Sequence, residues 1–260
     1  MTDPLHGVRA FYDQHSATFL QHAGPTFQAG LLRRGGVEDA ARSNLALAER
    51  AGVLPGHRVL DAGCGVAGPA LDIAAALADV VVDGVTLSPV QAALAADRIA
   101  AAGLADRVRV QVADYHHLPF AAASFDCVLY LESAGYSTDP AALFAEARRV
   151  LRPGGRLYIK DVVRRPGRLS PQQQEELAAY DATWAVPGTP TVDTLQSALA
   201  ASGFVEQESS ELDVGSSHFI GSMFELGPDG FVLNAFGEGF FRRFVDLPIL
   251  FAELRARAPG

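Results

Sequence analysis

The sequence predicts an α/β protein in which helices cover both faces of a parallel sheet. Short apolar runs, rich in β-branched residues, alternate with helical patterns between residues 57 and 163. The fourth run, 127–131, is apolar throughout, as expected of a strand that is buried on both faces. Several of the helical patterns start with clear capping signals. This alternation is typical of βαβ units with right-handed crossovers.

The individual elements are expected in a regular order along the chain. We expect strands at 57–63, 80–87, 107–114, 127–131 and 154–163, with helices at 66–78, 88–103 and 139–151. Beyond them the pattern predicts helices at 170–185 and 191–204 and a strand at 204–212. Residues 4–51 look helical and irregular, and residues 216–260 show no assignable pattern. Two of the helices begin with a predicted capping box, made by Ser88 with Gln91 and by Ser170 with Gln173.

Length and composition limit the class of protein. The 260 residues fit one large α/β domain or one domain with an added cap, and 49% apolar residues can form a sizeable core. A net charge of -9 argues against nucleic acid as the main partner, although a few arginines could hold a small anion. Two cysteines suggest neither a disulfide framework nor a metal site. Without a leader-like or membrane-length apolar run, we expect a soluble, cytoplasmic protein with no membrane span.

A glycine-rich turn joins the first strand to the first helix of this region. In "VLDAGCGVAG", Gly63, Gly65 and Gly68 form the pattern G-x-G-x-x-G, which lets the backbone approach a ligand at a helix N-terminus. Nicotinamide enzymes, flavoproteins and methyltransferases share this pattern, and a tight turn without a ligand is the alternative. A nicotinamide site would carry an acid at the end of the second strand. Here Thr86 stands there, while Asp61 precedes the glycines, which argues against a nicotinamide enzyme.

The turn resembles the first motif of class I S-adenosylmethionine-dependent methyltransferases. "VLDAGCGVAGPALDIA" is most similar to the form seen in sterol C-methyltransferases, with Ala67 where that family usually has glycine. "ADYHHLPFAAASFDCVLY" and "VLRPGGRLYI" match later motifs, so the resemblance covers about residues 59–163. It implies a Rossmann-like class I methyltransferase sandwich. Residues 1–55 would form an N-terminal helical lid, 56–165 the S-adenosylmethionine-binding core, and 166–260 the rest of the sheet plus acceptor-pocket elements.

The resemblance also implies which residues hold the methyl donor. Asp61, Gly63 and Gly65 would organise the loop around the amino-acid part of S-adenosylmethionine, and Tyr12 could contact its sulfonium end.

Other donor contacts are expected after the second and third strands. Asp114 resembles the acid that accepts a hydrogen bond from adenine, with Tyr115 against the ring; a loop-capping aspartate is the alternative. Thr86 and Gln91 would pair with the ribose hydroxyls, since "VTLSPVQ" resembles the "TLSxxQ" run of sterol, cyclopropane fatty acid and isoprenoid diphosphate C-methyltransferases. The alternative for Gln91 is the capping box alone.

Glu132 ends the fourth apolar run, and a charge there must be solvated, paired or used. The segment "YLESAGYS" resembles geranyl diphosphate C-methyltransferases, in which a Glu-Ser-x-x-Tyr run follows the fourth strand. The resemblance implies that Glu132, with Tyr136 beside it, faces the donor methyl group. A carboxylate there could stabilise a carbocation and then remove a proton. A loop salt bridge or a helix cap is the alternative.

Aromatic residues are expected to form the wall of the acceptor pocket. Tyr130 flanks Glu132 in sequence, and Tyr180 and Trp184 could join from the region after the fifth strand, with their π faces toward positive charge. Such a wall would also exclude water from a cation.

The remaining candidates are histidines, arginines and a metal ion. His116, His117 and His218 could act as a base or contact the substrate, although a lone histidine is more often structural. The arginine pairs 33–34 and 242–243 could clamp an anion or lie on a solvated surface. No spacing indicates a metal site, and Mg²⁺ is expected only with a diphosphate acceptor.

The sequence therefore predicts an S-adenosylmethionine-dependent methyltransferase of small molecules. The preferred acceptor is an alkene carbon of an isoprenoid, such as a prenyl diphosphate, or of a related specialised metabolite. An O- or N-methyltransferase of a small natural product is the alternative, because the same donor motifs serve those enzymes. An NAD(P)-dependent oxidoreductase and a binding module without catalysis are more distant alternatives. A homo-oligomer is compatible with all of them.

Overall fold

A computed structural model describes residues 5–28, 33–34, 37–212 and 247–260 of the chain. Three residues with predicted roles, His218 and the arginines at 242 and 243, lie outside this part. For residues 33 and 34 the structure describes the backbone alone.

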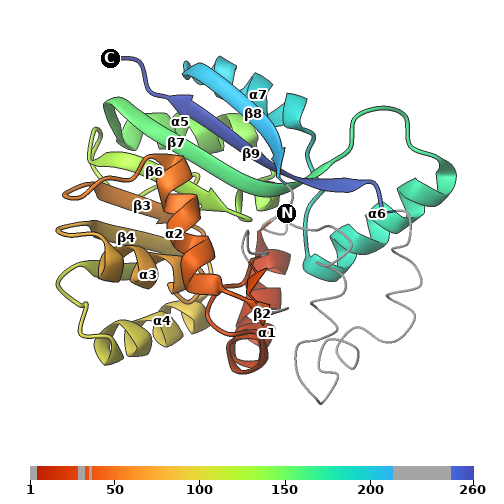
Figure 1. Ribbon diagram of the computed structural model, residues 1–260. Coiled ribbons are helices and arrows are strands. Elements are labelled where there is room, and N and C mark those ends of the chain that lie inside the picture. The colour runs from red at the N-terminus through yellow and green to blue at the C-terminus, as the bar shows by residue number, and fades with distance from the viewer. Residues whose placement is uncertain (1–4, 29–32, 35–36, 213–246) are drawn as a thin grey trace.

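The core is one seven-stranded sheet whose strand order is β5-β4-β3-β6-β7-β9-β8 (Figure 1). The first five strands in that order are parallel, and β9 runs antiparallel to both of its neighbours. The strands are β3 (Arg58–Ala62), β4 (Val81–Thr86), β5 (Val108–Val112), β6 (Phe125–Leu131), β7 (Leu151–Arg164), β8 (Val205–Leu212) and β9 (Ile249–Arg257). This sheet confirms the predicted fold class and the five predicted parallel strands.

Helices cover both faces of the sheet, and each face has its own apolar core. The helices α2 (Ala40–Ala51), α3 (Gly68–Ala76) and α4 (Pro89–Ala101) pack on one face, where Val59, Val82 and Leu129 are buried. The helices α5 (Pro140–Val150) and α7 (Val192–Ala201) pack on the other, where Leu60 and Val128 are buried. Consecutive residues of one strand thus enter opposite cores, as the period of two in a strand requires.

The end of the chain completes the sheet in a way that the sequence did not predict. Residues 249–257, which show no clear pattern in the sequence, form β9 between β7 and β8. β9 pairs with β7 from Arg156 to Arg164, and Leu151 at the start of β7 pairs with Phe125 of β6. β7 is therefore longer than expected and starts directly after α5. The pairing partner of β7 is therefore distant in sequence, and local pattern could not supply it.

Two helices lie beside the sheet rather than on its faces: α1 (His6–Ala23) and α6 (Pro171–Trp184). Helix α1 contacts the segments that follow β4 and β6, the two strands on either side of β3. Asp13 accepts a hydrogen bond from Ser88 after β4 at 2.5 Å, and Tyr12 is bonded to Tyr136 after β6 at 2.8 Å. Helix α1 therefore crosses the carboxyl edge of the parallel strands. The short strands β1 (Arg33–Arg34) and β2 (Val37–Glu38) pair with each other. Among the described helices, none combines the length and the apolar character needed to cross a bilayer.

Candidate functional site

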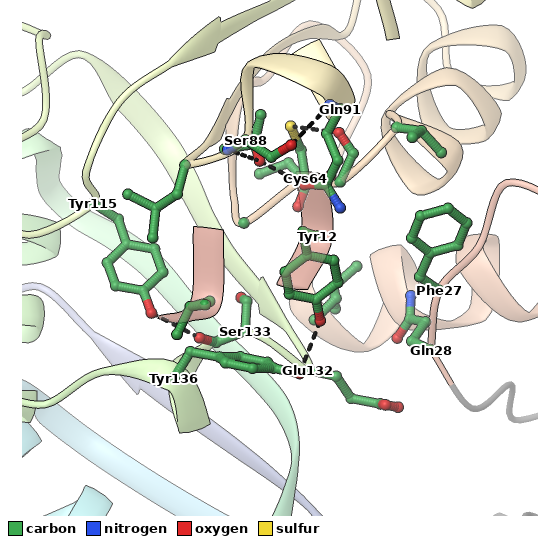
Figure 2. Close-up of a pocket in the computed structure, with 18 of the residues that line it drawn as sticks. Tyr12, Phe27, Gln28, Cys64, Ser88, Gln91, Tyr115, Glu132, Ser133 and Tyr136 are labelled. Carbon is green, nitrogen blue, oxygen red and sulfur yellow. Dashed lines mark hydrogen bonds between the residues drawn. The ribbon is translucent and has the colours of Figure 1, made fainter. Parts of the chain in front are cut away.

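A pocket that is partly open to solvent lies at the carboxyl ends of β3, β4 and β6 (Figure 2). This is the edge at which ligands bind in open parallel sheets, near the point where the strand order reverses between β3 and β6. The loop after β3, the ends of β4, β5 and β6, helix α1, the short helix η1 (Ala134–Tyr136) and residues 25–28 all contribute lining residues. The pocket therefore joins the glycine loop to Glu132.

The glycines of the loop after β3 are needed for close packing and for backbone conformation. Gly63 and Gly65 have φ angles of +91° and +53°, in the left-handed region that favours glycine. A Cβ at Gly63 would collide with the side chain of Ser133, and one at Gly68 would collide with the carbonyl oxygen of Pro25. Gly63 and Gly65 line the pocket. The loop therefore has the predicted backbone conformation, and a side chain at Gly63 would not fit beside Ser133.

Asp61 brings an unsatisfied carboxylate oxygen to this loop. Its side chain is buried and lines the pocket, and Oδ2 has no hydrogen-bond donor within the part of the chain that the structure describes. Burial raises the pKa of Asp61 to about 7. A buried carboxylate without a partner is costly, so a ligand that carries a donor or a positive charge would be favoured here. The amino-acid part of S-adenosylmethionine carries an ammonium group, so the residues present fit this cofactor.

Gln91 corrects one prediction at the start of α4. Ser88 caps the helix by accepting a hydrogen bond from the Gln91 N–H at 3.0 Å, but the Gln91 side chain does not complete a capping box. Its Oε1 accepts a hydrogen bond from the Thr86 hydroxyl at 2.6 Å instead, and both side chains line the pocket. Thr86 and Gln91 thus form one polar unit at the wall where the ribose was expected.

Asp114 and Tyr115 differ in their relation to the pocket. Tyr115 lines it, and its buried hydroxyl donates to the Ser133 carbonyl at 3.0 Å; burial raises the pKa of this hydroxyl. Asp114 is not among the lining residues, and its Oδ1 accepts a hydrogen bond from the His116 N–H at 2.8 Å. The geometry of Asp114 therefore matches the loop-capping alternative, and a contact with adenine stays a prediction.

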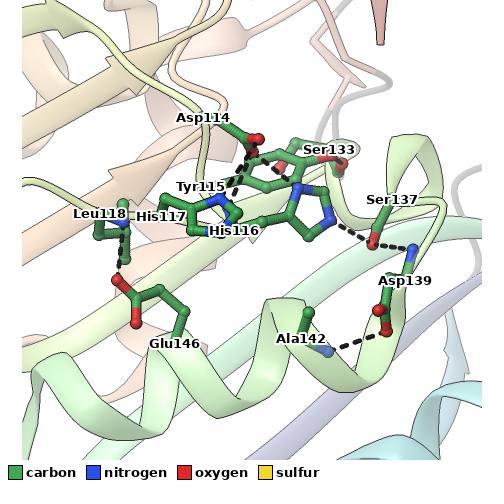
Figure 3. A network of polar contacts seen from close by, with 10 residues as sticks. All are labelled: Asp114, Tyr115, His116, His117, Leu118, Ser133, Ser137, Asp139, Ala142 and Glu146. Atoms are coloured by element: carbon green, nitrogen blue, oxygen red, sulfur yellow. Dashed lines mark hydrogen bonds and ion pairs between the residues drawn. The ribbon is translucent and has the colours of Figure 1, made fainter. Parts of the chain in front are cut away.

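The histidines after Asp114 do not face the pocket. Nδ1 of His116 lies 2.7 Å from Asp114 Oδ1, and its Nε2 lies 2.8 Å from Ser137 Oγ (Figure 3). These contacts tie the loop after β5 to the segment that precedes α5. His117 is largely exposed. The structure therefore places both in structural or surface positions, and not where a base for methyl transfer would stand.

Glu132 forms an ion pair. The sequence suggested a salt bridge as the alternative role of this residue, but it did not identify the partner. The Glu132 carboxylate forms an ion pair with Lys160, the only lysine of the chain, whose side chain is fully buried. The Glu132 side chain is 13% exposed and lines the pocket. The main chain is also bonded, since the Glu132 N–H donates to the Lys160 carbonyl at 2.6 Å. Lys160 follows an apolar run in β7 beside Glu132 in the sheet, a position that only strand pairing reveals.

Tyr12 and Tyr136 contact each other in the pocket that Glu132 also lines. Their hydroxyls are 2.8 Å apart, their ring centroids are separated by 5.7 Å, and both residues line the pocket (Figure 2). Burial raises the pKa of Tyr12 to about 12 and also raises that of Tyr136. Both phenols therefore stay neutral at ordinary pH and act as hydrogen-bonding groups.

The other aromatic candidates lie behind or outside the pocket wall. Tyr130 is fully buried against Phe144, with ring centroids 6.2 Å apart, and is not a lining residue. Alternation along β6 turns Leu131 toward the pocket and Tyr130 toward α5, so a substrate contact of Tyr130 stays a prediction that this geometry does not favour. Tyr180 packs behind the wall with Val162, Leu212 and Phe251, and Trp184 stacks edge-on with Phe11 at 6.3 Å.

Asp161 is a buried acid near the site that the sequence interpretation missed. Its carboxylate accepts hydrogen bonds from the N–H groups of Gly135 at 2.9 Å and Val162 at 2.8 Å. Burial raises the pKa of Asp161 to about 7. The sequence did carry a signal for Asp161, because this acid directly precedes the apolar residues Val162 and Val163 of β7. Among the described residues, no three His, Cys, Asp or Glu side chains gather in a way that could hold a metal ion.

Comparisons with known proteins give the family. A methyltransferase domain model matches residues 60–159. Methyltransferase GfsG of Streptomyces halstedii is 44% identical over 48% of this chain and 45% of its own length. The 27-O-demethylrifamycin SV methyltransferase of Amycolatopsis mediterranei is 46% identical over 43% of this chain and 42% of its own length. The chain thus matches less than half of these two proteins. O-methyltransferase rstn1 of Aspergillus nomiae is 32% identical over 76% of this chain and 88% of its own length.

Solved structures share the whole fold. The [4+2]-cyclase SpnF superposes with a TM-score of 0.80 and 26% identity over 97% of this chain and 96% of its own. Geranyl diphosphate C-methyltransferase from Streptomyces coelicolor superposes with a TM-score of 0.75 and 20% identity over 99% of this chain and 98% of its own, and shows the fold alone. The resemblance seen in the sequence is thereby confirmed. The chain belongs to the family of S-adenosylmethionine-dependent methyltransferases.

Proposed function

We propose that this protein transfers the methyl group of S-adenosylmethionine to a small molecule that binds next to Glu132. The observation that carries the proposal is the buried, unpartnered Oδ2 of Asp61 in the same pocket as Glu132. One end of the pocket, with Asp61 and the glycine loop, would hold the methyl donor. The other end, with the ion-paired Glu132, would hold the acceptor.

The donor end acts by binding and orientation. S-adenosylmethionine, when bound, supplies a methyl group on a sulfonium that is already activated. Asp61 would hold the ammonium group, and the Thr86–Gln91 unit would hold neighbouring hydroxyls. Tyr12 and the residues at 25–28 would exclude water from the reacting atoms.

The acceptor end acts through Glu132, and the preferred acceptor atom is an alkene carbon. Methyl addition to an alkene leaves a cation, from which a proton must then be lost. Because Lys160 already compensates the charge of Glu132, the role that fits this carboxylate best is to accept that proton. Sterol 24-C-methyltransferase ERG6B of Gibberella zeae is 36% identical over 44% of this chain and 30% of its own length, which supports a carbon atom as the acceptor.

A hydroxyl oxygen is the second candidate acceptor. O-methyltransferase rstn1 covers more of this chain than the sterol enzyme does, which favours this alternative. Glu132 would then take the hydroxyl proton, so its role as proton acceptor is the same in both cases.

Label transfer tests the proposal and separates the two acceptors. The protein is incubated with methyl-labelled S-adenosylmethionine and with panels of prenyl diphosphates, sterols and hydroxylated aromatic or polyketide natural products, and mass spectrometry locates the label. We expect a labelled product from one panel, with the label on carbon in the preferred case. Donor binding without label transfer to any panel would favour a binding role or a cyclase role like that of SpnF, and would contradict the proposal.

A further inference from the structure

We propose that Lys160 is a positioning residue for the reaction, which holds the Glu132 carboxylate aimed into the pocket. The inference rests on the proposed role of Glu132 as proton acceptor. Lys160 acts through Glu132, because Glu132 lines the pocket and Lys160 does not.

The burial of Lys160 is the first argument. Its side chain has no exposed surface, and lysine is rarely buried so completely unless it is paired. A buried ion pair adds little to stability, because the cost of desolvating both charges offsets their attraction. Replacement of both partners by apolar side chains is often neutral or stabilising, so the stability of the fold does not by itself account for this pair.

The main chain supplies the second argument, since it fixes Glu132 at the same point. Leu131 of β6 lies opposite Lys160 of β7, and the Glu132 N–H donates to the Lys160 carbonyl at 2.6 Å. Glu132 has a φ angle of +54°, a conformation that is costly for a residue with a side chain. Glu132 is thus held by its backbone and by its carboxylate, and both contacts come from Lys160.

The ammonium group of Lys160 is itself held in place. It donates to Gln28 Oε1 at 3.3 Å and lies 5.3 Å from the centroid of the Phe251 ring. Gln28 lines the pocket and belongs to the segment after α1, and Phe251 comes from β9. Contacts from three segments thus limit the motion of Lys160, as a positioning role requires.

Within the described part of the chain, the other titratable groups close enough to Glu132 to interact with it electrostatically are acids. They are Tyr12 of α1, Tyr180 of α6 and Asp161 of β7, with Tyr136 of η1 hydrogen-bonded to Tyr12. Lys160 therefore supplies the positive charge that the Glu132 carboxylate contacts among these acids.

The test compares Lys160→Met with Lys160→Arg. Methionine keeps the length of the side chain without the charge, and arginine keeps the charge. We expect Lys160→Met to melt lower than wild type, because it leaves the Glu132 carboxylate without its partner. The folded variant should bind S-adenosylhomocysteine within about twofold of wild type and lose about 10²-fold in kcat. Lys160→Arg should recover most of the activity.

A double variant excludes a merely structural role. In a Glu132→Gln background, Lys160→Met should cause no further loss of kcat, since the group through which it acts is already absent. A further loss in that background, or a Lys160→Arg variant as inactive as Lys160→Met, would overturn the inference.

Carboxyl ¹³C NMR of glutamate-labelled protein gives a readout that needs no activity, with Glu132→Gln to assign the signal. The Glu132 signal should move in Lys160→Met and stay close to its wild-type position in Lys160→Arg. An unmoved signal in Lys160→Met would contradict the inference. A moved signal in a protein that methylates no acceptor would refute the proposed function and leave the pairing role of Lys160 standing.

Discussion

The two ends of the pocket differ in whether their polar groups already have partners. At the donor end, Asp61 is buried with an oxygen that contacts no donor within the described chain. At the acceptor end, Glu132 is paired with Lys160, and Tyr12 is bonded to Tyr136. The donor end is therefore built to gain a ligand group, whereas the acceptor end is already satisfied before a substrate binds. This difference implies that the donor gains a new contact with Asp61 when it binds. The acceptor, in contrast, must bind beside the Glu132–Lys160 and Tyr12–Tyr136 contacts that already exist.

The largest effect is expected from the loss of the acceptor-end carboxylate. Glu132→Gln keeps the shape of the side chain but cannot take a proton, so kcat should fall by about 10³-fold or more. Because the donor end is separate, the affinity for S-adenosylhomocysteine should stay within about twofold. Steady-state kinetics and calorimetry measure the two quantities. Comparable losses in both would show that the two ends are not independent.

Asp61→Asn should break the donor end while stabilising the empty protein. Burial raises the folded-state pKa of Asp61 from 3.8 to about 7, so its contribution to stability is greatest below pH 3.8 and is lost as the pH rises through 7. At pH 8 the asparagine variant has no such buried charge. Its free energy of unfolding should exceed that of wild type by about 2 kcal/mol in the absence of ligand. Denaturant unfolding at pH 5 and pH 8 measures this; a variant that is less stable than wild type at pH 8 would contradict the unpartnered state of Asp61.

A matched pair of glutamines sharpens the comparison, because both follow Ser-Pro at a helix start. At α6 the box is complete, with Ser170 and Gln173 bonded reciprocally, whereas Gln91 of α4 turns to Thr86 in the pocket. Gln91→Ala should weaken S-adenosylhomocysteine binding about 5–10-fold, as for the loss of hydrogen bonds to a ligand. Gln173→Ala should leave binding unchanged and lower the free energy of unfolding by about 0.5–1 kcal/mol. Equal effects of the two changes on binding would remove the distinction.

The smallest effect is expected at the Tyr12–Tyr136 bond. Tyr12→Phe keeps the ring and removes one hydrogen bond, so kcat/KM should fall only about 2–5-fold. Tyr136→Phe should cost about the same, and the double variant should cost no more than either single one, because each removes the same bond. Additive losses would indicate separate roles for the two hydroxyls.

The donor end could be predicted from the sequence because its features are local. The glycines at 63 and 65 and the acid at 61 follow directly from a strand that leads into a tight turn. Thr86 likewise stands at the end of its own strand. Features that depend on one short segment leave a readable pattern.

The acceptor end could not be predicted in the same way, because its contacts join distant segments. The Glu132–Lys160 pair depends on the register of β6 and β7, and β7 in turn pairs with β9, which comes from a tail without a clear pattern. Proximity to Glu132 in sequence does not place Tyr130 in the pocket, because alternation along the strand turns the two side chains apart. The spacing from Ser88 predicts a capping box for Gln91, but this box does not form. The Gln91 side chain instead accepts a hydrogen bond from the Thr86 hydroxyl, which lies on the other side of the turn.

Calorimetric titration with S-adenosylhomocysteine at pH 6, 7 and 8 tests the central claim most directly, with wild type and Asp61→Asn side by side. We expect wild type to bind, with an affinity that falls by up to about tenfold per pH unit below pH 7, as Asp61 takes up a proton. The variant should bind more weakly and without this pH dependence. Binding of NADH in place of S-adenosylhomocysteine, or equal affinities of the two proteins at pH 8, would contradict the assignment of Asp61 and of the pocket.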